Sequence, residues 1–381
     1  MRYRKTTSSL FVLCAAALVL SACGAELDET ADQAVVPEDE GDDGEGLDVD
    51  AQAEGDGPLI AFVAFTQDIT EMAGQQIIGL EAAFEEAGFE YTMNTAAPAG
   101  AEDHDGMDRI LQDTATLAPD YAIVNPASYA LVDDRIAEIE AAGTTTIVGA
   151  IDPGTLEESP DADPLTWVAV DEYAMGHNGA EFLAQGYCEA GEDITVVPFW
   201  GPAASEISQD RVGGALDALD DTLGECGLEY EVVDEVFADF NREKAFRFTE
   251  TIVTAHPDVD LIIGANSNTA LGVMESLTAQ GRIDDIDILG NGGQLDELAA
   301  ICRGDITAAG FRDAYQMGFD MAEAIMRDWE GNGEEVPEVT LSDLPVTHDC
   351  ESVFDAVPMQ MLEHEGFQDN IPDGTWEEFT R

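Results

Sequence analysis

The sequence predicts an α/β fold of two similar lobes, each with a parallel sheet covered by helices. Residues 58–381 are long enough for two domains of ordinary size. Short apolar runs alternate along this span with amphipathic stretches, which is the pattern of strands separated by covering helices. A weak internal repeat, described below, indicates that the two halves share one plan.

The N-terminus predicts export from the cytoplasm. Basic residues at positions 2, 4 and 5 precede an apolar run over residues 10–20, which is too short to span a bilayer. The tetrapeptide Leu-Ser-Ala-Cys that ends at Cys23 resembles the lipobox of bacterial lipoproteins. Residues 1–22 are then a signal peptide, and Cys23 carries the lipid. An ordinary secretory signal with an incidental cysteine is the alternative.

Residues 23–57 are expected to form a disordered acidic tether. The stretch from Gly24 to Gly57 is rich in Asp, Glu and Gly, contains no Lys or Arg, and has few large apolar residues. Such a segment buries too little surface to offset its ordering entropy, and its charges repel one another. We expect it to hold the folded part clear of the membrane while keeping it close to a membrane partner.

The charge balance excludes several classes of partner. Three of the 14 basic residues lie in the signal peptide, which leaves 11 against 81 acidic residues and a net charge of about −70. Nucleic acid and anionic lipid surfaces are therefore not expected to bind the body of the protein. We interpret the charge as a solvated surface suited to saline surroundings, and expect membrane attachment through the lipid only.

The strands of the two sheets are predicted at nearly continuous apolar runs. Such runs are typical of strands covered on both faces. They occur at residues 59–65, 121–124, 146–151, 194–199, 261–263 and 286–289.

The internal repeat places matching polar residues after two of these strands. GFEYTMN from Gly88, then APDYAIVN ending at Asn125, recurs as GLEYEVV from Gly227 and HPDVDLIIGAN ending at Asn266. In open parallel sheets, ligands bind at the carboxyl edge of the strands. We therefore expect Asn125 and Asn266 to face each other across a cleft. The alternative is that both only cap the following helices, since Asn is a favoured N-cap.

Several segments resemble the ribose-binding-protein family, which are periplasmic binding proteins of the first type. The resemblance extends from residue 58 to about residue 357 and rests on the order and spacing of its segments. They are YAIVNPAS at Tyr121, SQDRVGGALDAL at Ser208, FADFNREKA at Phe237, TAHPDVDLIIGANSNTALG at Thr254 and DAYQMG at Asp313. It implies two Rossmann-like lobes joined by a three-strand hinge, with the ligand cleft at the strand carboxyl ends.

Placed on this sequence, the three crossings fall near residues 168–170, 311–313 and 340–345. The N-terminal lobe is then expected at 58–169 plus 313–341, and the C-terminal lobe at 170–312 plus 342–381.

The body contains four cysteines, Cys188, Cys226, Cys302 and Cys350, which allow three pairings. Disulfides are favoured in an oxidising compartment. The resemblance places all four in the C-terminal lobe, so that no disulfide ties the lobes together. On that ground we expect Cys188 to pair with Cys226, and Cys302 with Cys350.

The resemblance also implies site residues. Arg211 matches an arginine that donates to sugar hydroxyls, Phe240 an aromatic cleft residue, and Asn125 and Asn266 polar contacts from each lobe. Arg312 falls where the family has a hinge glutamine. A neutral polyol needs such amide and guanidinium partners, together with aromatic rings for its C–H faces. For Arg211 the alternative is a surface ion pair.

Other candidates follow the predicted strands directly. Phe65 and Trp200 end corresponding strands of the two lobes and are candidate stacking platforms, with burial in the core as the alternative. Gln67, Asp68 and Asp152 lie in loops after strands and are candidate acceptors for hydroxyl groups. Each of these three could equally cap a helix or face solvent.

The chain departs from the family in the loops that contact the ligand. Gln-Asp-Ile-Thr at residues 67–70 replaces Asn-Pro-Phe-Phe, and Ile-Asp-Pro at 151–153 replaces an Asp-Arg pair. Gly-Asn-Gly-Gly at 290–293 replaces Phe-Asp-Gly, so a carboxylate is missing and Asn291 is the candidate replacement. Another monosaccharide, a polyol or a different small molecule is therefore more consistent with the loops than ribose.

These observations predict a solute-binding lipoprotein that delivers a small polar ligand to an ABC permease. A nucleophile elbow, a phosphate loop and a metal-binding His pair are all missing from the sequence, so we expect neither catalysis nor a cofactor or metal. A monomer is expected. Ligand sensing for a receptor is the alternative, whereas the signal and the lack of a basic helix-turn-helix argue against a gene regulator.

Overall fold

The computed structural model describes residues 46–53, 55–65, 71–99, 103–126, 133–149, 162–191, 193–203, 205–333, 336–342 and 344–379. They belong to a compact unit that runs from Gly41 to Arg381. Within it the strands form two sheets, and each sheet with its covering helices is called a lobe below.

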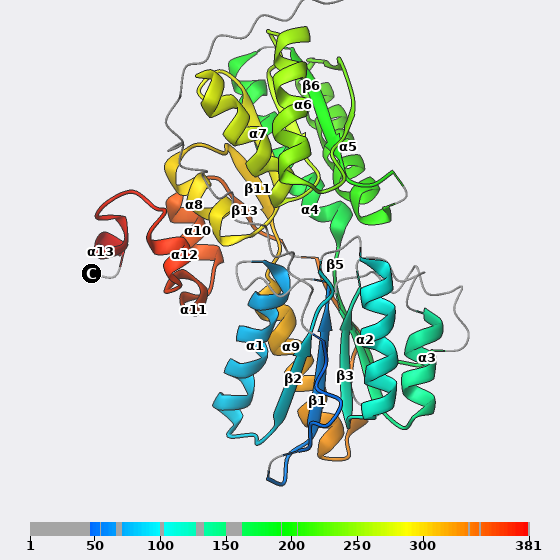
Figure 1. Cartoon of the computed structure of the whole chain (residues 1–381). Helices are drawn as coiled ribbons and strands as arrows, with labels where there is room; N and C mark the ends of the chain where they lie inside the picture. The colour runs from blue at the N-terminus through cyan, green and yellow to red at the C-terminus, as the bar shows by residue number, and fades with distance from the viewer. Residues whose placement is uncertain are drawn as a thin grey trace, which may run out of the picture. The chain divides into compact units, whose positions relative to one another are not determined.

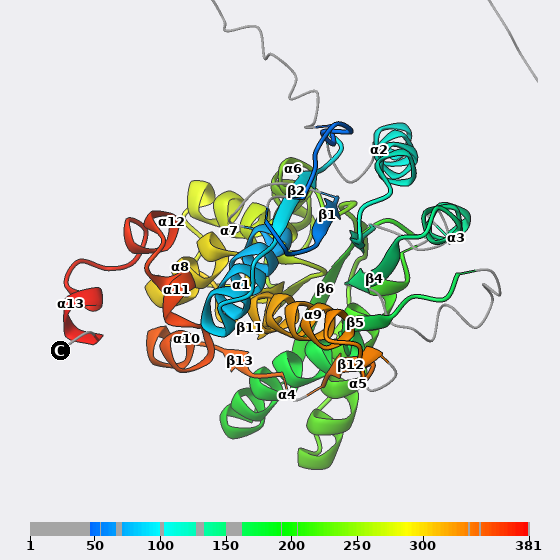
Figure 2. The same cartoon turned by 90° about the horizontal axis from the view of Figure 1, so that it is seen from below.

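The first lobe is built on a six-stranded sheet in the order β12-β5-β4-β3-β1-β2, and its strand pairs are all parallel. Helices α1 and α9 cover one face, and α2 and α3 cover the other (Figures 1 and 2). The strands are β1 (Leu59–Ala64), β2 (Thr92–Ala96), β3 (Tyr121–Asn125), β4 (Thr145–Gly149), β5 (Thr166–Val170) and β12 (Val339–Leu341). The helices are α1 (Met72–Ala87), α2 (His104–Leu117), α3 (Asp133–Ala141) and α9 (Ala314–Trp329).

The second lobe is built on a seven-stranded sheet in the order β13-β11-β10-β9-β6-β7, with β8 paired to β6. Its pairs are parallel except β11 with β13. Helices α4 and α5 cover one face, and α6, α7 and α8 cover the other. The strands are β6 (Ile194–Trp200), β7 (Tyr230–Val232), β8 (Val236–Phe237), β9 (Leu261–Gly264), β10 (Asp287–Gly292), β11 (Ala308–Phe311) and β13 (Val346–Thr347). The helices are α4 (Glu172–Ala190), α5 (Glu206–Cys226), α6 (Arg242–Ala255), α7 (Ser267–Gln280) and α8 (Leu295–Arg303).

The prediction of an α/β fold with two parallel sheets is confirmed apart from the antiparallel strand β13, and each of the six predicted strands is present. The repeated segments form equivalent strands, because β2 and β7 each occupy the edge next to the first strand of its lobe. Strand β10 extends beyond its predicted end, since Asn291 and Gly292 pair with Gly310 and Phe311 of β11.

The chain passes between the two sheets three times: after β5, after β11 and after β12. Most helices of the second lobe begin at a side chain that accepts a bond from a first-turn backbone N–H. These caps are Asp171, Ser205, Asn241 and Asn266. Four of the helices that meet the second sheet end at a glycine with positive φ, namely Gly191, Gly227, Gly281 and Gly304.

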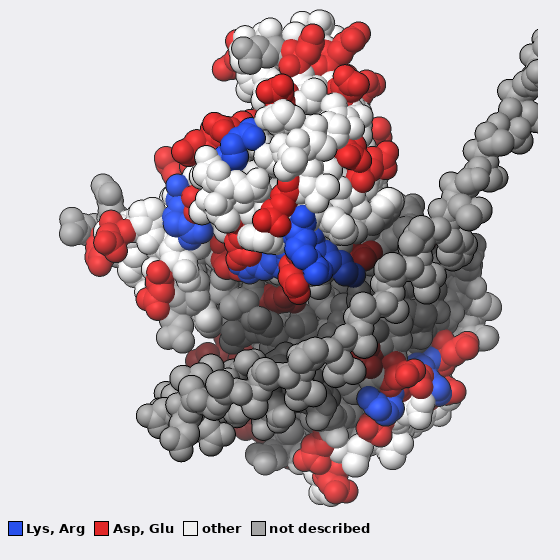
Figure 3. All heavy atoms as spheres, turned by 45° about the horizontal axis from the view of Figure 1, so that its top comes forward, with Lys and Arg blue, Asp and Glu red and all other residues white. Residues whose placement is uncertain are grey.

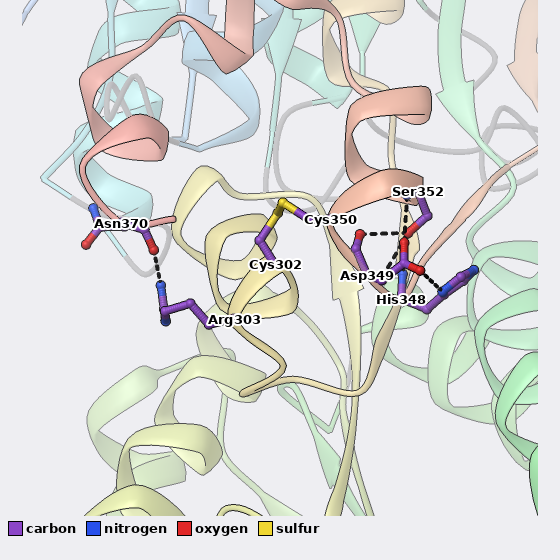
Figure 4. Close-up of a disulfide and its surroundings, with 7 residues drawn as sticks. All are labelled: Cys302, Arg303, His348, Asp349, Cys350, Ser352 and Asn370. Atoms are coloured by element: carbon purple, nitrogen blue, oxygen red, sulfur yellow. Dashed lines mark hydrogen bonds and ion pairs between the residues drawn. A yellow bond between two sulfur atoms is a disulfide. The ribbon is translucent and has the colours of Figure 1, made fainter. Parts of the chain in front are cut away.

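Two disulfides lie in the second lobe, with the pairing expected from the sequence. Cys188 of α4 is bonded to Cys226 at the end of α5, and Cys302 of α8 to Cys350. Cys350 begins a C-terminal set of short helices: α10 (Cys350–Ala356), α11 (Met359–Leu362), α12 (Glu365–Gln368) and α13 (Thr375–Phe379). Arg303 Nη1 donates to the Asn370 carbonyl at 2.6 Å beside this disulfide (Figure 4). The disulfide and the bond from Arg303 both fasten the C-terminal helices to α8.

The expected disordered tether extends too far toward the C-terminus. Leu47 is 7% exposed and packs with Met107 in the first lobe. Asn94 on β2 donates from Nδ2 to the Asp48 carbonyl at 2.8 Å. The tether was predicted from the composition of the whole segment. A single apolar side chain such as Leu47 changes that composition little, yet it can be buried. The signal peptide, Cys23 and residues 24–45 of the tether lie outside the described residues.

On the described part of the face shown in Figure 3, carboxylates are scattered and the basic side chains lie beside them. Arg242, for example, contacts both Glu275 and Asp296, at 2.8 Å and 2.6 Å. Exposed pairs of this kind contribute little to stability. Within the described part of the chain, none of the helices is apolar over a length that could cross a membrane.

Candidate functional site

A cavity of about 300 Å³ lies at the carboxyl ends of the strands and is lined by both lobes. Phe65 follows β1 and Pro126 follows β3, while Asn266 follows β9. Parallel strands present their carboxyl ends at one edge, which explains why residues so far apart in sequence meet there. Its volume falls within the range of small-molecule sites.

Six of the predicted ligand-binding residues line this cavity. They are Phe65, Arg211, Phe240, Asn266, Asn291 and Arg312. Asn125 and Trp200 are not among the lining residues. Gln67, Asp68 and Asp152 lie outside the described residues.

Arg211 lines the cavity and is also part of a buried ion pair. Its side chain donates from Nε to Glu172 Oε2 at 2.7 Å and from Nη2 to Oε1 at 3.1 Å. Nη1 donates to the Ala265 carbonyl at 3.0 Å. Arg211 is 4% exposed, so the pair differs from the surface ion pair considered as an alternative. A forked pair of this geometry fixes the guanidinium plane.

Arg312 shares the same carboxylate. It donates from Nη2 to Glu172 Oε1 at 2.8 Å, while its Nε is buried without a partner among the described residues. Burial raises the pKa of Glu172, and the guanidinium of Arg312 opposes that shift. Glu172 begins α4 directly after β5, and Arg312 directly follows β11, so this pair joins two of the three connections between the lobes.

Phe240 is held over the cavity by an unusual backbone. Asp239 and Phe240 both have positive φ, at 54° and 57°. This conformation costs free energy for residues other than glycine and is concentrated at functional sites. The Phe240 ring lies so close to Gly201 that a Cβ there would overlap it. The sequence around Gly201 therefore leaves room for an aromatic wall.

The two matching asparagines have different surroundings. Asn266 lines the cavity and also caps α7, because its Oδ1 accepts from Thr269 N at 2.9 Å. Asn266 thus both caps α7 and lines the cavity, and its contact with a ligand stays a prediction. Asn125 is fully buried, and neither of its amide atoms has a partner among the described residues. Its side chain lies against Gly149, where a Cβ would overlap Asn125 Oδ1.

Trp200 is not part of the cavity lining and packs against the core, which is the alternative given above. Its ring stacks on Phe237 with centroids 6.3 Å apart and packs against the core beneath α5. Trp200 ends β6, and its register partner on β8 is Phe237, the residue on which its ring stacks. Phe65, in contrast, lines the cavity from the end of β1.

Asn291 belongs to a polar wall at the end of β10. Its Nδ2 donates to the Gly264 carbonyl at 2.9 Å, and its Oδ1 is buried without a partner among the described residues. Ser267 lines the same wall and donates to Glu297 Oε2 at 2.6 Å. Glu297 is itself fully buried.

Several residues of the site were not anticipated from the sequence. Gln75 Nε2 donates to the Gly293 carbonyl at 2.9 Å, and Asn268 Nδ2 donates to Glu71 Oε1 at 3.2 Å. Both bonds join the first turn of α1 to the second lobe. One signal was available, since Gln75 and Gln76 are adjacent amides on a helix that otherwise buries apolar residues. The sequence also indicated that an acidic partner such as Glu172 was needed. Two arginines predicted for the site, Arg211 and Arg312, require a counter-charge if they are buried.

The lining therefore offers guanidinium and amide donors, amide and backbone acceptors and aromatic surface. Such a set suits a small molecule with several hydroxyl groups and a C–H face.

Comparisons with known proteins agree with this geometry. Residues 60–333 match the family model of the periplasmic binding protein domain. The ribose import binding protein RbsB of Bacillus subtilis is 25% identical over 192 residues, which cover 50% of this chain and 57% of that protein. The D-apiose import binding protein of Paraburkholderia graminis is 30% identical over 145 residues, covering 38% of this chain and 45% of that protein. The chain spans about half the length of these curated relatives.

Solved structures show the same fold. An ABC transporter periplasmic solute binding protein from Actinobacillus succinogenes with bound D-allose superimposes with a TM-score of 0.67 at 20% identity, covering 78% of this chain and 99% of that chain. A solute binding protein from Bacillus halodurans with bound myo-inositol gives a TM-score of 0.62 at 19% identity, covering 78% and 96%. The matched span, the two parallel sheets and the cavity at their carboxyl ends show that this chain belongs to the periplasmic binding protein family, with the type I fold.

Proposed function

We propose that this chain is an extracytoplasmic binding protein that captures a monosaccharide or polyol between its two lobes and delivers it to an ABC importer. The observation that carries the proposal is the cavity shared by both lobes, with Arg211, Asn266 and Phe240 on its wall. Relatives and structural neighbours are named for ribose, D-apiose, D-allose and myo-inositol, which are all polyhydroxylated. The proposed role is binding and release without catalysis.

The ligand would stabilise a closed arrangement by bonding both lobes at once. Gln75 and Asn268 already provide bonds between the lobes beside the cavity. A ligand that adds bonds to Arg211 and to the first turn of α1 would favour closure by its differential affinity for the closed state.

Attachment to the cell membrane is proposed through Cys23, with the importer as the partner and the protein as a monomer. The lipobox-like sequence and the acidic stretch after it support this arrangement. Replacing Cys23 with Ser should release the exported protein from the membrane fraction. Retention of Cys23→Ser protein in that fraction would argue against a lipid anchor at this residue.

The test of ligand class is a thermal-shift screen of the purified protein with D-ribose, D-allose, D-apiose, myo-inositol and the common amino acids. Calorimetry would follow on each compound that raises the melting temperature. At least one sugar or polyol should bind with one-to-one stoichiometry. A shift only with compounds from another class would overturn the sugar assignment.

A second function, ligand sensing for a receptor, uses the same site. A sensing protein would bind a receptor in the membrane instead of an importer. Uptake of radiolabelled sugar by cells that lack this protein therefore distinguishes import from sensing. Import predicts lost uptake, and sensing predicts unchanged uptake with a lost transcriptional response.

A further inference from the structure

The carboxyl group of Glu297 is buried beneath the cavity wall without contributing to the lining. Glu297 lies in the first turn of α8 and is 0% exposed. Its Oε2 accepts from Ser267 Oγ at 2.6 Å and from the Gly293 N–H at 2.8 Å. Its Oε1 has no partner among the described residues. One oxygen thus joins the start of α7 to the end of β10.

The glycines of the 290–293 segment make room for this carboxyl group and its partner Ser267. A Cβ at Gly290 would overlap Glu297 Oε1, and a Cβ at Gly292 would overlap Ser267 Oγ. Gly293 has a φ of 127°, a region open chiefly to glycine. The Gly-rich sequence at 290–293 and Glu297 therefore form one arrangement, in which the carboxyl group of α8 lies beneath the cavity wall.

The atoms that Glu297 holds are parts of the binding site. Ser267, Gly292, Gly293 and Gln294 all line the cavity. The Gly293 carbonyl accepts from Gln75 Nε2 of the first lobe at 2.9 Å, so its position decides whether that bond can form. Ser267 Oγ also accepts hydrogen bonds from the backbone N–H groups of Gly293 and Gln294, at 3.2 Å and 3.4 Å. The α8 N-cap residue, Gln294, makes no side-chain cap bond of its own.

We propose that Glu297 is a positioning residue of the ligand site, which fixes Ser267 and the 292–294 turn and so aligns the Gly293 carbonyl with the first lobe. This inference rests on the proposed binding function.

Burying this group is costly, which argues for a role. Desolvation raises the pKa of Glu297 to about 7, with Asp296 adding to the shift and the bonds from Ser267 and Gly293 opposing it. An apolar side chain of similar size would avoid that desolvation. The chain nevertheless has a carboxyl group at this position. Its acceptor oxygen orders the start of α7 at Ser267 and the turn at Gly293.

The test compares Glu297→Leu, which removes the acceptor, with Glu297→Gln, which keeps an acceptor oxygen of the same reach. Asp296→Asn is the matched control, because Asp296 is the preceding residue and pairs with Arg242 on the surface. D-allose and myo-inositol serve as probes in calorimetry. We expect affinity to fall about tenfold or more in Glu297→Leu and to stay within about threefold of wild type in Glu297→Gln and Asp296→Asn.

A double-mutant cycle separates positioning from general destabilisation. If Glu297 acts by aligning the Gly293 carbonyl for Gln75, then Glu297→Leu and Gln75→Leu should be non-additive in affinity. Additive effects, or wild-type affinity in a folded Glu297→Leu protein, would overturn the proposal.

Hydrogen exchange provides a readout that needs no ligand. The Gly293 and Gln294 amides should exchange at least about tenfold faster in Glu297→Leu, with the β9 amides unchanged. If neither sugar binds the wild-type protein, the choice of sugar as ligand is contradicted, and this exchange measurement alone decides the role of Glu297. Unchanged exchange at both amides would contradict that role.

Discussion

The two walls of the cavity differ in how their side chains are held. We call the lining residues of the first lobe before residue 127 the first wall and those between residues 201 and 295 the second wall. In the second wall, Arg211 is fixed by Glu172, Ser267 by Glu297, and Asn266 by the start of α7. In the first wall, Gln75 and Glu71 reach across to Gly293 and Asn268 of the other lobe. The second wall is organised by bonds within its own lobe, whereas these first-wall contacts depend on the approach of the lobes.

The helix starts show the same difference. Asn266 caps α7 with its own side chain, but Glu71 makes no side-chain cap bond at the start of α1. Preorganised groups lose less entropy on binding. We therefore expect the second wall to receive the ligand first and the first wall to complete the site on closure. The four predictions below test this division, from the largest expected effect to the smallest.

Replacing Glu172 with Leu should lower the free energy of unfolding by about 3 to 5 kcal/mol, because two guanidinium groups would then be buried without their counter-charge. Urea denaturation measures this loss. Glu206→Gln is the control, since Glu206 is exposed in the first turn of α5 and should change stability by less than about 0.5 kcal/mol. Equal stability of the two variants would show that the pair does not organise the second wall.

Glu297 should make the stability of the protein depend on pH. Its pKa is about 7 in the folded protein against 4.5 for the ordinary group, so the folded state binds more protons between these values. The free energy of unfolding should therefore fall as pH rises from 4.5 to 7, by roughly 3 kcal/mol relative to Glu297→Gln, and then level off. Chemical denaturation across this range is the measurement. Parallel pH profiles for the two proteins would refute the shift.

Arg211→Ala should weaken binding of the sugar found in the screen by about 1.5 to 3 kcal/mol, the range for hydrogen bonds to charged groups. Calorimetry measures the change. Arg247→Ala is the matched control, because Arg247 is an exposed arginine of α6 whose contact is Glu243 at 3.5 Å. An unchanged affinity in Arg211→Ala would remove this residue from the binding site.

Gln75→Leu should weaken binding by about 0.5 to 1.5 kcal/mol, because it removes one neutral hydrogen bond between the lobes. Its effect should appear mainly as faster dissociation, which stopped-flow fluorescence can follow. A loss as large as that of Arg211→Ala would mean that the first wall contributes as much as the second.

The fold could be predicted because its signals are local and repeated. Each predicted strand was a short apolar run, and the matched segments ending at Asn125 and Asn266 indicated the duplicated plan. The tether boundary was wrong at Leu47, where a single apolar side chain decides burial.

The site was less predictable, because its organisation depends on contacts between distant segments. Arg211 was a candidate from sequence, but its buried partner Glu172 comes from another helix 39 residues away. Likewise Asn291 was considered as the replacement for the missing carboxylate, whereas the structure places the carboxyl group of Glu297 beneath the same wall. Such pairings depend on how helices dock on a sheet, which no local pattern specifies.

Hydrogen exchange with and without bound sugar tests the difference between the two walls most directly. Amides near Thr269 and Gly293 should be protected before any ligand is added and should change little on binding. Amides in the first turn of α1, around Gln75, should gain protection only when the sugar is present. Equal gains in both walls, or a first turn of α1 already fully protected without ligand, would contradict the account.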